Sequence, residues 1–314
     1  MARITAAFRI GRILSPAAVS ISVVAALLLL VFVAPLSAQT GALIQKVDQG
    51  RINWLSGELR AVGEAEARAQ MWDEQVKQGV MRRQALMNGR RHLYAALKSV
   101  RINNSLTVRD LVVKDRVLRE QLKGRVNNSV VLDRTFVPGE RMRLRVEMKL
   151  WGALSKMLIP DSVWYEKSSD VSSKALDRQE MQGSEETERH TGLIVDARGL
   201  NVEPSLVCRV YGPKERLLYG PGIVRPSIAI GRGMAGYMRE RDSAVRASRT
   251  GADPLILRAR ERAASKGCEI TVSAEDSQAL LPSPESIGFL RQGKVILLVG
   301  SEDGEGPTEY QLDQ

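Results

Sequence analysis

The clearest hydrophobic pattern in the chain lies between Met142 and Leu150, where apolar and charged residues alternate strictly. Such a period of two is typical of a half-buried β-strand. Residues 129–137 form a second strand candidate, and the Pro-Gly-Glu-Arg segment between the two is typical of a turn. The pattern therefore predicts an antiparallel β-hairpin that ends near Leu150.

Helical periodicity precedes this hairpin. Residues 65–100 place apolar side chains on one face and arginines on the opposite face. The apolar positions are Leu86, Leu93, Leu97 and Val100. A second helix is predicted to begin at Thr107, which has Asp110 at capping-box spacing, and to end at Gly124.

A short strand candidate at 57–65 comes before both helices. Residues 51–160 are therefore predicted to fold as β-α-α-β-β, an antiparallel sheet with helices on one face.

Apolar runs return after Thr191 and predict a second α+β domain over 191–300, a mixed sheet with short helices. Residues 294–299 form an unbroken apolar run that is typical of an interior strand. A helix is predicted over 233–247, and Ser273 is predicted to cap a short helix before the last strand. The fold class is thus α+β, with two small domains.

Two segments of the sequence are predicted to be unstructured. Residues 161–190 hold eight acidic and four basic residues with few large apolar ones, which is typical of an acidic flexible linker. Residues 301–314 contain five acidic residues and no basic one, which predicts an acidic disordered tail. Apolar residues make up 44% of the whole chain and aromatics only 4%, so aliphatic side chains must form most of the core.

The N-terminus has the pattern of a secretory signal peptide. Three arginines precede an apolar centre at 19–34, and small residues follow it. This pattern predicts a signal peptide over 1–38 with cleavage between Ala38 and Gln39. The alternative is an uncleaved N-terminal anchor, since residues 17–34 approach the length that spans a bilayer. Either way, the rest of the chain is expected in the periplasm.

The charge is unevenly distributed. Residues 51–160 hold 22 basic and 11 acidic residues, and the whole chain has a formal net charge of +10. Anionic lipid, cell-wall polymer or an acidic envelope protein are therefore candidate partners. Nucleic acid is not expected in this compartment. Solvated arginine faces that bind no specific polyanion are the simpler interpretation.

The two cysteines, Cys208 and Cys268, form a disulfide candidate because the chain is predicted to be exported. The alternative is a pair of buried apolar thiols. No cysteine follows the apolar N-terminal run, so a lipid-anchored lipoprotein is not expected.

Residues 231–236 match the G-x-G-x-x-G pattern of dinucleotide-binding loops, in which glycine backbones approach a pyrophosphate. Pro226 lies just before the motif, and no clear β-α-β unit surrounds it. We therefore interpret it as a glycine-rich turn and expect no cofactor.

Catalytic residues are scarce in the sequence. The only histidines, His92 and His190, have no partner at metal-ligand spacing and complete no catalytic triad. Asp196, at the end of an apolar strand, is the best carboxylate candidate for acid–base chemistry. The simpler interpretation is an ion pair with Arg198 that caps a turn before Gly199. We therefore predict neither catalytic nor metal-binding residues.

Several segments together resemble a family of exported bacterial proteins. The segment TGLIVDARGL at 191–200, the motif PSL at 204–206 and the motif LYG at 218–220 carry the resemblance, together with MKLWG at 148–152 and DPL at 253–255. They are similar to the LPP-twenty lipoprotein family and to flagellar assembly protein T. The resemblance implies an envelope protein without known catalytic residues, and one relative helps to build a ring around the flagellar motor.

These observations favour a non-enzymatic periplasmic protein that acts by binding, an assembly or scaffold factor. Its candidate partners are envelope proteins and further copies of itself in a homo-oligomer. A carboxylate-dependent envelope hydrolase and a module for anionic lipid or cell-wall polymer are the alternatives. An exposed apolar patch or an unpaired strand edge would favour assembly.

Overall fold

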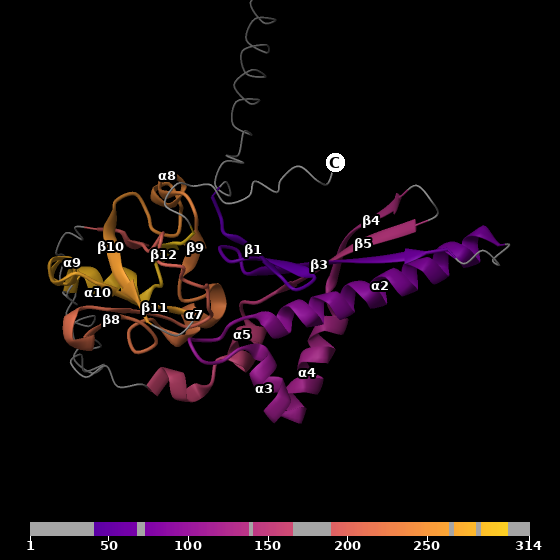
Figure 1. Cartoon of the computed structure of the whole chain (residues 1–314), viewed down its shortest axis with the longest axis horizontal. Coiled ribbons are helices and arrows are strands. Elements are labelled where there is room, and N and C mark those ends of the chain that lie inside the picture. The colour runs from indigo at the N-terminus through magenta and orange to yellow at the C-terminus, as the bar shows by residue number, and fades with distance from the viewer. Residues whose placement is uncertain are drawn as a thin grey trace, which may run out of the picture. The chain divides into compact units, whose positions relative to one another are not determined.

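The computed structural model describes residues 41–67, 73–137, 141–165, 190–263, 267–280 and 284–300. It contains an antiparallel sheet covered by helices, followed by a mixed sheet with short helices (Figure 1). The predicted α+β class is thus confirmed. Among the residues described, no helix is both long and apolar enough to cross a membrane.

The first sheet has five strands in the order β1-β2-β3-β5-β4, and every neighbouring pair is antiparallel. The strands are β1 (Ile44–Val47), β2 (Gly50–Asn53), β3 (Glu58–Glu66), β4 (Val130–Val137) and β5 (Arg141–Lys149). The β4–β5 hairpin and β3 follow the predicted pattern. The β1–β2 hairpin was not predicted, and it begins before the expected boundary at Arg51, because strands of four residues have little periodicity to detect.

Helix α2 (Glu74–Ser99) packs along β3 and β5 and buries the predicted Leu93 and Leu97. It begins nine residues later than predicted, because β3 continues to Glu66 and Asp73 caps the helix through the backbone N–H groups of Gln75 and Val76. Close packing depends on Gly63, since a Cβ there would lie 2.0 Å from the carbonyl oxygen of Ala85.

The second predicted helix is divided in two, as α3 (Val108–Lys114) and α4 (Arg116–Asn127). The capping box of Thr107 and Asp110 is confirmed, because each side chain accepts from the other's backbone N–H. Asp115 ends α3 and caps α4 through Leu118 N. The predicted end at Gly124 is wrong, since α4 continues one turn further to Asn127.

A short connection follows the first sheet. It consists of helix α5 (Ala153–Leu158) and the 3-10 helix η2 (Asp161–Tyr165), neither of which was predicted. Helix η2 occupies the first residues of the expected linker at 161–190. Residues 166–189 and the expected tail at 301–314 lie outside the described residues.

The second sheet has the order β8-β7-β11-β10-β6-β12-β9 and mixes parallel with antiparallel pairs. Its strands are β6 (Gly192–Asp196), β7 (Cys208–Tyr211), β8 (Leu217–Tyr219), β9 (Gly236–Met238), β10 (Pro254–Arg262), β11 (Cys268–Val272) and β12 (Val295–Leu298). All four residues of β12 are buried, which confirms the interior strand expected from its unbroken apolar run.

The helices of this part are short. They are the 3-10 helix η3 (Pro213–Glu215), α7 (Pro226–Arg232), α8 (Arg241–Val245), α9 (Ala274–Ala279) and α10 (Pro284–Arg291). Ser273 caps α9 as predicted. The helix predicted over 233–247 is wrong, because strand β9 interrupts it and only the five residues of α8 are helical. Glycines at 233 and 236 favour extended backbone over helix there.

One hydrophobic core contains buried residues from both sheets. Backbone hydrogen bonds tie the two parts together, from Leu206 N to Arg101 O and from Leu43 N to Tyr237 O. The rings of Trp54 and Tyr237 meet edge to face, with centroids 5.5 Å apart.

Candidate functional site

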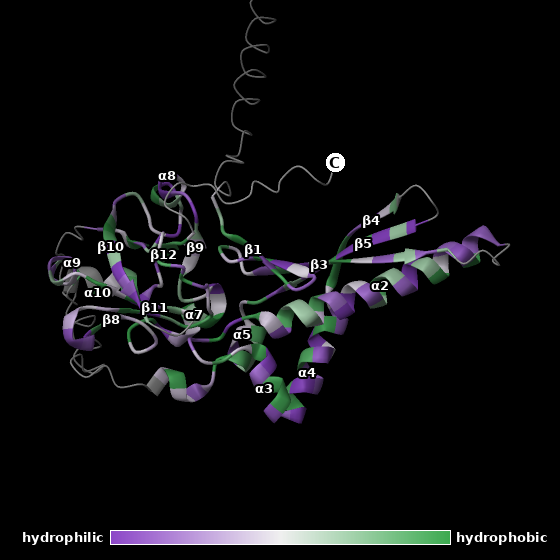
Figure 2. Cartoon of the chain, in the orientation of Figure 1, coloured by the Kyte–Doolittle hydropathy of each residue, from purple (hydrophilic) through white to green (hydrophobic). Residues whose placement is uncertain are grey.

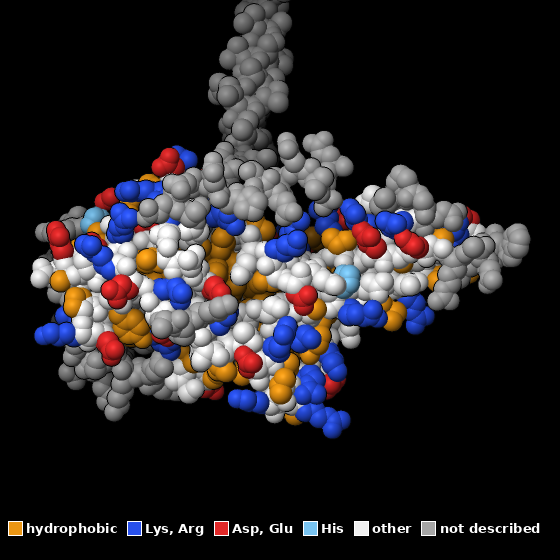
Figure 3. Space-filling view, in the orientation of Figure 1, with side chains coloured by type: hydrophobic (Ala, Val, Ile, Leu, Met, Phe, Trp, Pro, Cys, Tyr) orange, Lys and Arg blue, Asp and Glu red, His pale blue; other side chains and the backbone are white. Residues whose placement is uncertain are grey.

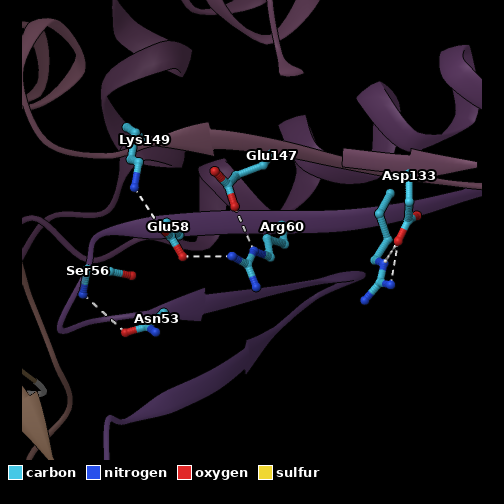
Figure 4. Close-up of polar contacts among 8 residues, drawn as sticks. Asn53, Ser56, Glu58, Arg60, Asp133, Glu147 and Lys149 are labelled. Atoms are coloured by element: carbon cyan, nitrogen blue, oxygen red, sulfur yellow. Dashed lines mark hydrogen bonds and ion pairs between the residues drawn. The ribbon is translucent and has the colours of Figure 1, made fainter. Parts of the chain in front are cut away.

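The outer face of the first sheet carries a ladder of ion pairs between β3 and β5 (Figure 4). Arg60 Nε donates to Glu147 Oε2 at 2.7 Å, and Lys149 Nζ donates to Glu58 Oε1 at 2.6 Å. Arg60 also reaches Glu58, at 2.8 Å. In each of the first two pairs the residues stand directly opposite across the antiparallel strands.

The ladder continues toward the far end of the strands. Arg143 contacts Glu64 at 2.8 Å, and Arg141 contacts Glu66 at 2.7 Å. Arg145 turns to the other neighbour and binds Asp133 on β4.

These ion pairs change the interpretation of the basic charge in residues 51–160. Each basic side chain of β3 and β5 on this face has a carboxylate partner, so the ladder itself offers little uncompensated charge to a polyanion. Arg51 on β2 differs, because it stands directly opposite Arg60. Burial raises the pKa of Glu58, but hydrogen bonding and charge from Lys149 and the charge of Arg60 outweigh it and lower that pKa below 4.5. The ion pairs of the ladder thus join β3 to β5 and keep the Glu58 carboxylate ionised.

Strand β4 forms an open edge of the first sheet, because among the described residues it pairs with β5 and with no other strand. It is eight residues long, whereas the other edge strands of the two sheets, β1, β8 and β9, have three or four. The β9 edge is also covered, since Ala42 bridges to Met238. Short or covered edges avoid pairing with other chains, and β4 lacks both protections.

Four large apolar side chains of β4 are exposed to solvent. Phe136 is 53% exposed and Val130 61%, and Val131 and Leu132 are exposed as well. Figure 2 shows hydrophobic segments at both ends of this strand. A bulge between Val131 and Asp133 breaks the regular pairing with β5 on one side. The strand therefore combines unpaired backbone groups with apolar side chains, the combination that strand addition uses.

Asp196 lies at the end of β6, where the sequence placed it. Its carboxylate accepts from Arg198 Nε at 2.9 Å, from Arg198 Nη2 at 2.6 Å and from the Arg198 backbone N–H at 3.2 Å. Gly199 follows with φ of +79°. The predicted ion pair before a turn is therefore present, and it occupies both oxygens of the carboxylate.

The glycine-rich segment at 231–236 runs from the last two residues of helix α7 to the first residue of strand β9. That order is the reverse of the strand-then-helix order in a dinucleotide-binding loop. Its carbonyl groups, rather than its N–H groups, face a charged partner. The guanidinium of Arg249 donates to the carbonyls of Arg232 at 2.9 Å, Gly233 at 2.7 Å and Met234 at 3.0 Å.

Arg249 is a buried cation that the sequence did not single out. It also donates to Val295 O at 2.9 Å, so it ties the glycine-rich segment to β12. Burial lowers the pKa of Arg249 to about 10, which leaves the guanidinium charged at neutral pH. No signal in the sequence distinguishes this arginine, because its partners are backbone carbonyls rather than acidic side chains.

The remaining chemical candidates lie apart. His92 Nδ1 lies 2.6 Å from Val62 O in the middle of β3, and His190 Nδ1 lies 3.6 Å from Asp253. A hollow of about 430 Å³ is lined by Glu64 and Glu66, whose carboxylates bind arginines of the ladder. The described residues contain no group of three or more metal-ligand side chains.

Cys208 and Cys268 stand directly opposite each other on the parallel strands β7 and β11. Their Cα atoms are 4.8 Å apart and the two sulfurs are joined in a disulfide. The predicted cleavage site at Ala38 and Gln39 lies outside the described residues.

Comparison with known protein families gives a match in the part of the chain that forms the second sheet. Residues 192–301 fit the family model for the second domain of Treponema pallidum Tp0624. No curated protein matches the chain. The matched range begins with β6 and covers all seven strands of the second sheet, so this part of the chain is similar to the second domain of the Treponema protein.

Proposed function

We propose that this chain is a non-enzymatic periplasmic protein of the bacterial envelope, an assembly or scaffold factor that acts by binding other proteins. The observation that carries the proposal is strand β4, the long open edge with exposed apolar side chains. A partner strand adding to β4 would satisfy its free backbone groups and cover Leu132 and Phe136.

Two further observations support an envelope role. The N-terminal residues have the basic, apolar and small-residue order of an export signal. The motifs around Asp196 resemble the LPP-twenty lipoprotein family and flagellar assembly protein T, whose relatives act in the envelope. A place in flagellar assembly is the more specific form of the proposal.

The hydrolase alternative has less support. A general acid or base needs a carboxyl group free to exchange a proton with substrate. Both oxygens of Asp196 bind Arg198, and the acids of the ladder bind basic partners. We therefore favour binding over turnover.

Site-specific photo-crosslinking in intact cells tests the proposal. A photoreactive amino acid at position 132, in place of Leu132, should give discrete protein adducts. The matched control carries the photoreactive amino acid in place of Met87 on α2, which is 57% exposed, and should not give these adducts. Phe136→Lys should abolish the adducts formed from position 132, because a lysine on an edge strand opposes pairing.

Loss of the adducts in the Phe136→Lys variant, with unchanged circular dichroism, would support strand addition. Adducts that form equally from Met87 or survive the lysine would overturn it. Edman sequencing of the protein from the periplasmic fraction should begin at Gln39, and recovery from the cytosol would contradict the envelope location.

A further inference from the structure

The second exposed apolar feature is the corner between α3 and α4, here called the α3–α4 corner (residues 109–125). The corner is held rigidly. Asp115 caps α4 through Leu118 N at 2.9 Å, and Arg119 Nε donates to Val112 O near the end of α3 at 2.8 Å. Figure 1 shows the two helices meeting at an angle there.

Two valines project from this corner into solvent. Val113 is 70% exposed and Val117 is 67% exposed, the two highest values among the exposed large hydrophobic side chains. Valine is a weaker helix former than alanine, lysine or glutamate, and at both positions most of the side chain is exposed rather than buried. The fold itself therefore gives no reason for valine at either position.

Basic residues surround the valines. The corner holds six basic residues, namely Arg109, Lys114, Arg116, Arg119, Lys123 and Arg125. Its three acidic residues are engaged locally: Asp110 in the capping box, Asp115 as the cap of α4, and Glu120 with Lys123 at 2.9 Å. In Figure 3, Lys and Arg side chains gather with hydrophobic ones over α3 and α4.

The bases next to the valines differ from those of the outer sheet face. Lys114 and Arg116 form no salt bridge with any described residue, whereas each base of the ladder has an acidic partner. Lys114 and Arg116 act on Asp110 and Glu120 through charge alone. The corner therefore combines a net positive charge with exposed apolar side chains within a few residues.

We propose that the α3–α4 corner docks on the surface of an anionic lipid bilayer. The valines would enter the boundary between headgroups and acyl chains, and Lys114 and Arg116 would contact lipid phosphates. Charge complementarity identifies the partner as anionic, and the paired valines identify it as a bilayer, because a soluble polyanion has no apolar layer to receive them. This contact is separate from strand addition at β4 and does not depend on it.

Vesicle sedimentation with the full chain tests the proposal, using phosphatidylcholine alone or mixed with phosphatidylglycerol. Binding to the mixed vesicles should exceed binding to the neutral ones and should weaken with salt. The double variant Lys114→Gln with Arg116→Gln should bind the mixed vesicles roughly tenfold more weakly than the parent chain, because each removed charge weakens binding by about fivefold or less. Val113→Ser with Val117→Ser should reduce binding by a similar factor, on the order of tenfold.

Matched variants on α2 separate this site from general charge and hydrophobicity. Arg82→Gln with Arg83→Gln removes the same charge, and Val76→Ser with Val80→Ser removes two exposed valines, so both should bind as the parent chain does. Val117→Trp should strengthen binding and shift tryptophan emission to the blue on mixed vesicles.

Three outcomes would overturn the proposal. An equal loss of binding in the α2 variants and the corner variants would indicate nonspecific attraction. A loss of binding in the lysine and arginine variant but not in the valine variant would indicate a soluble polyanion. Equal binding of every variant to both vesicle types would show that the corner does not select anionic lipid. Unchanged circular dichroism and melting temperature show that each variant is folded.

Discussion

The indole ring of Trp151 fills the space that a side chain at position 233 would need. A Cβ on Gly233 would lie 2.7 Å from Trp151 Cζ2, and one on Gly57 would lie 2.1 Å from Trp151 Nε1. Trp151 thus packs between a turn of the first sheet and the glycine-rich segment of the second part. Next to it, Gly152 N donates to Ile230 O at 2.6 Å.

Gly233→Ala should destabilise the protein by about 2 kcal/mol or more, because the new methyl group meets the indole and φ is +77° there. Gly231→Ala is the matched control, since nothing lies within 4 Å of its Cβ, and it should be neutral or slightly stabilising. Urea denaturation measures both. Trp151→Ala combined with Gly233→Ala should cost less than the sum of the single changes, and strict additivity would argue against the contact.

Arg249→Met should lower the free energy of unfolding by roughly 3–5 kcal/mol, because four backbone carbonyl groups, most of them buried, lose a charged donor. Arg249→Lys should recover little, since one ammonium group cannot reach both Gly233 and Val295. Arg246→Met, at an exposed position nearby, should change stability by less than about 0.5 kcal/mol. Equal melting temperatures for the Arg249 and Arg246 variants would contradict this role.

Asp196→Asn should reduce stability by about 1 kcal/mol at neutral pH and alter abundance rather than any catalytic rate. Burial raises the pKa of Asp196, but hydrogen bonds and charge from Arg198 outweigh it and lower the pKa below 3.8. A carboxylate with a lowered pKa stabilises the fold above its unfolded pKa, so the advantage over the asparagine variant should disappear as pH falls below about 4. Unfolding curves across that pH range measure the difference in stability between the parent chain and the variant. A variant that folds normally but loses a measurable hydrolysis would instead favour the enzyme alternative.

Arg60→Gln should cost about 0.5–1 kcal/mol at low salt and less at high salt, because it breaks exposed contacts with Glu58 and Glu147. Arg51 stands directly opposite Arg60 on β2, so Arg51→Gln removes a like-charge pair and should be neutral or slightly stabilising. Thermal unfolding at two salt concentrations distinguishes them. A loss of equal size in both variants would show that the ladder does not act through ion pairs.

Free-thiol counting on the unfolded, unreduced protein should find none, because Cys208 and Cys268 are joined across β7 and β11. The bond connects positions 60 residues apart, and replacing both cysteines by serine should cost about 2–4 kcal/mol. Two titratable thiols would show instead that the cysteines are buried and reduced in the native protein.

The sequence by itself determined the features that depend on neighbouring residues. The alternation at 142–150, the capping box at Thr107 and the ion pair of Asp196 with Arg198 each involve contacts within a few positions of the chain. Local geometry fixes such contacts, because the period of two or the spacing of a cap is the same in any protein. The α+β class followed from the same local patterns.

Only the tertiary structure decided which strand is an edge, where Arg249 finds its carbonyls and why residue 233 is glycine. Strand order depends on pairing between distant segments such as β6 and β12, and hydrophobic periodicity is equally consistent with other orders. The helix expected at 233–247 failed for the same reason, because pairing with β12 draws residues 236–238 into a strand. The open edge of β4 exists because no other segment of the described chain pairs with it, a property of the whole arrangement that no short stretch of sequence contains.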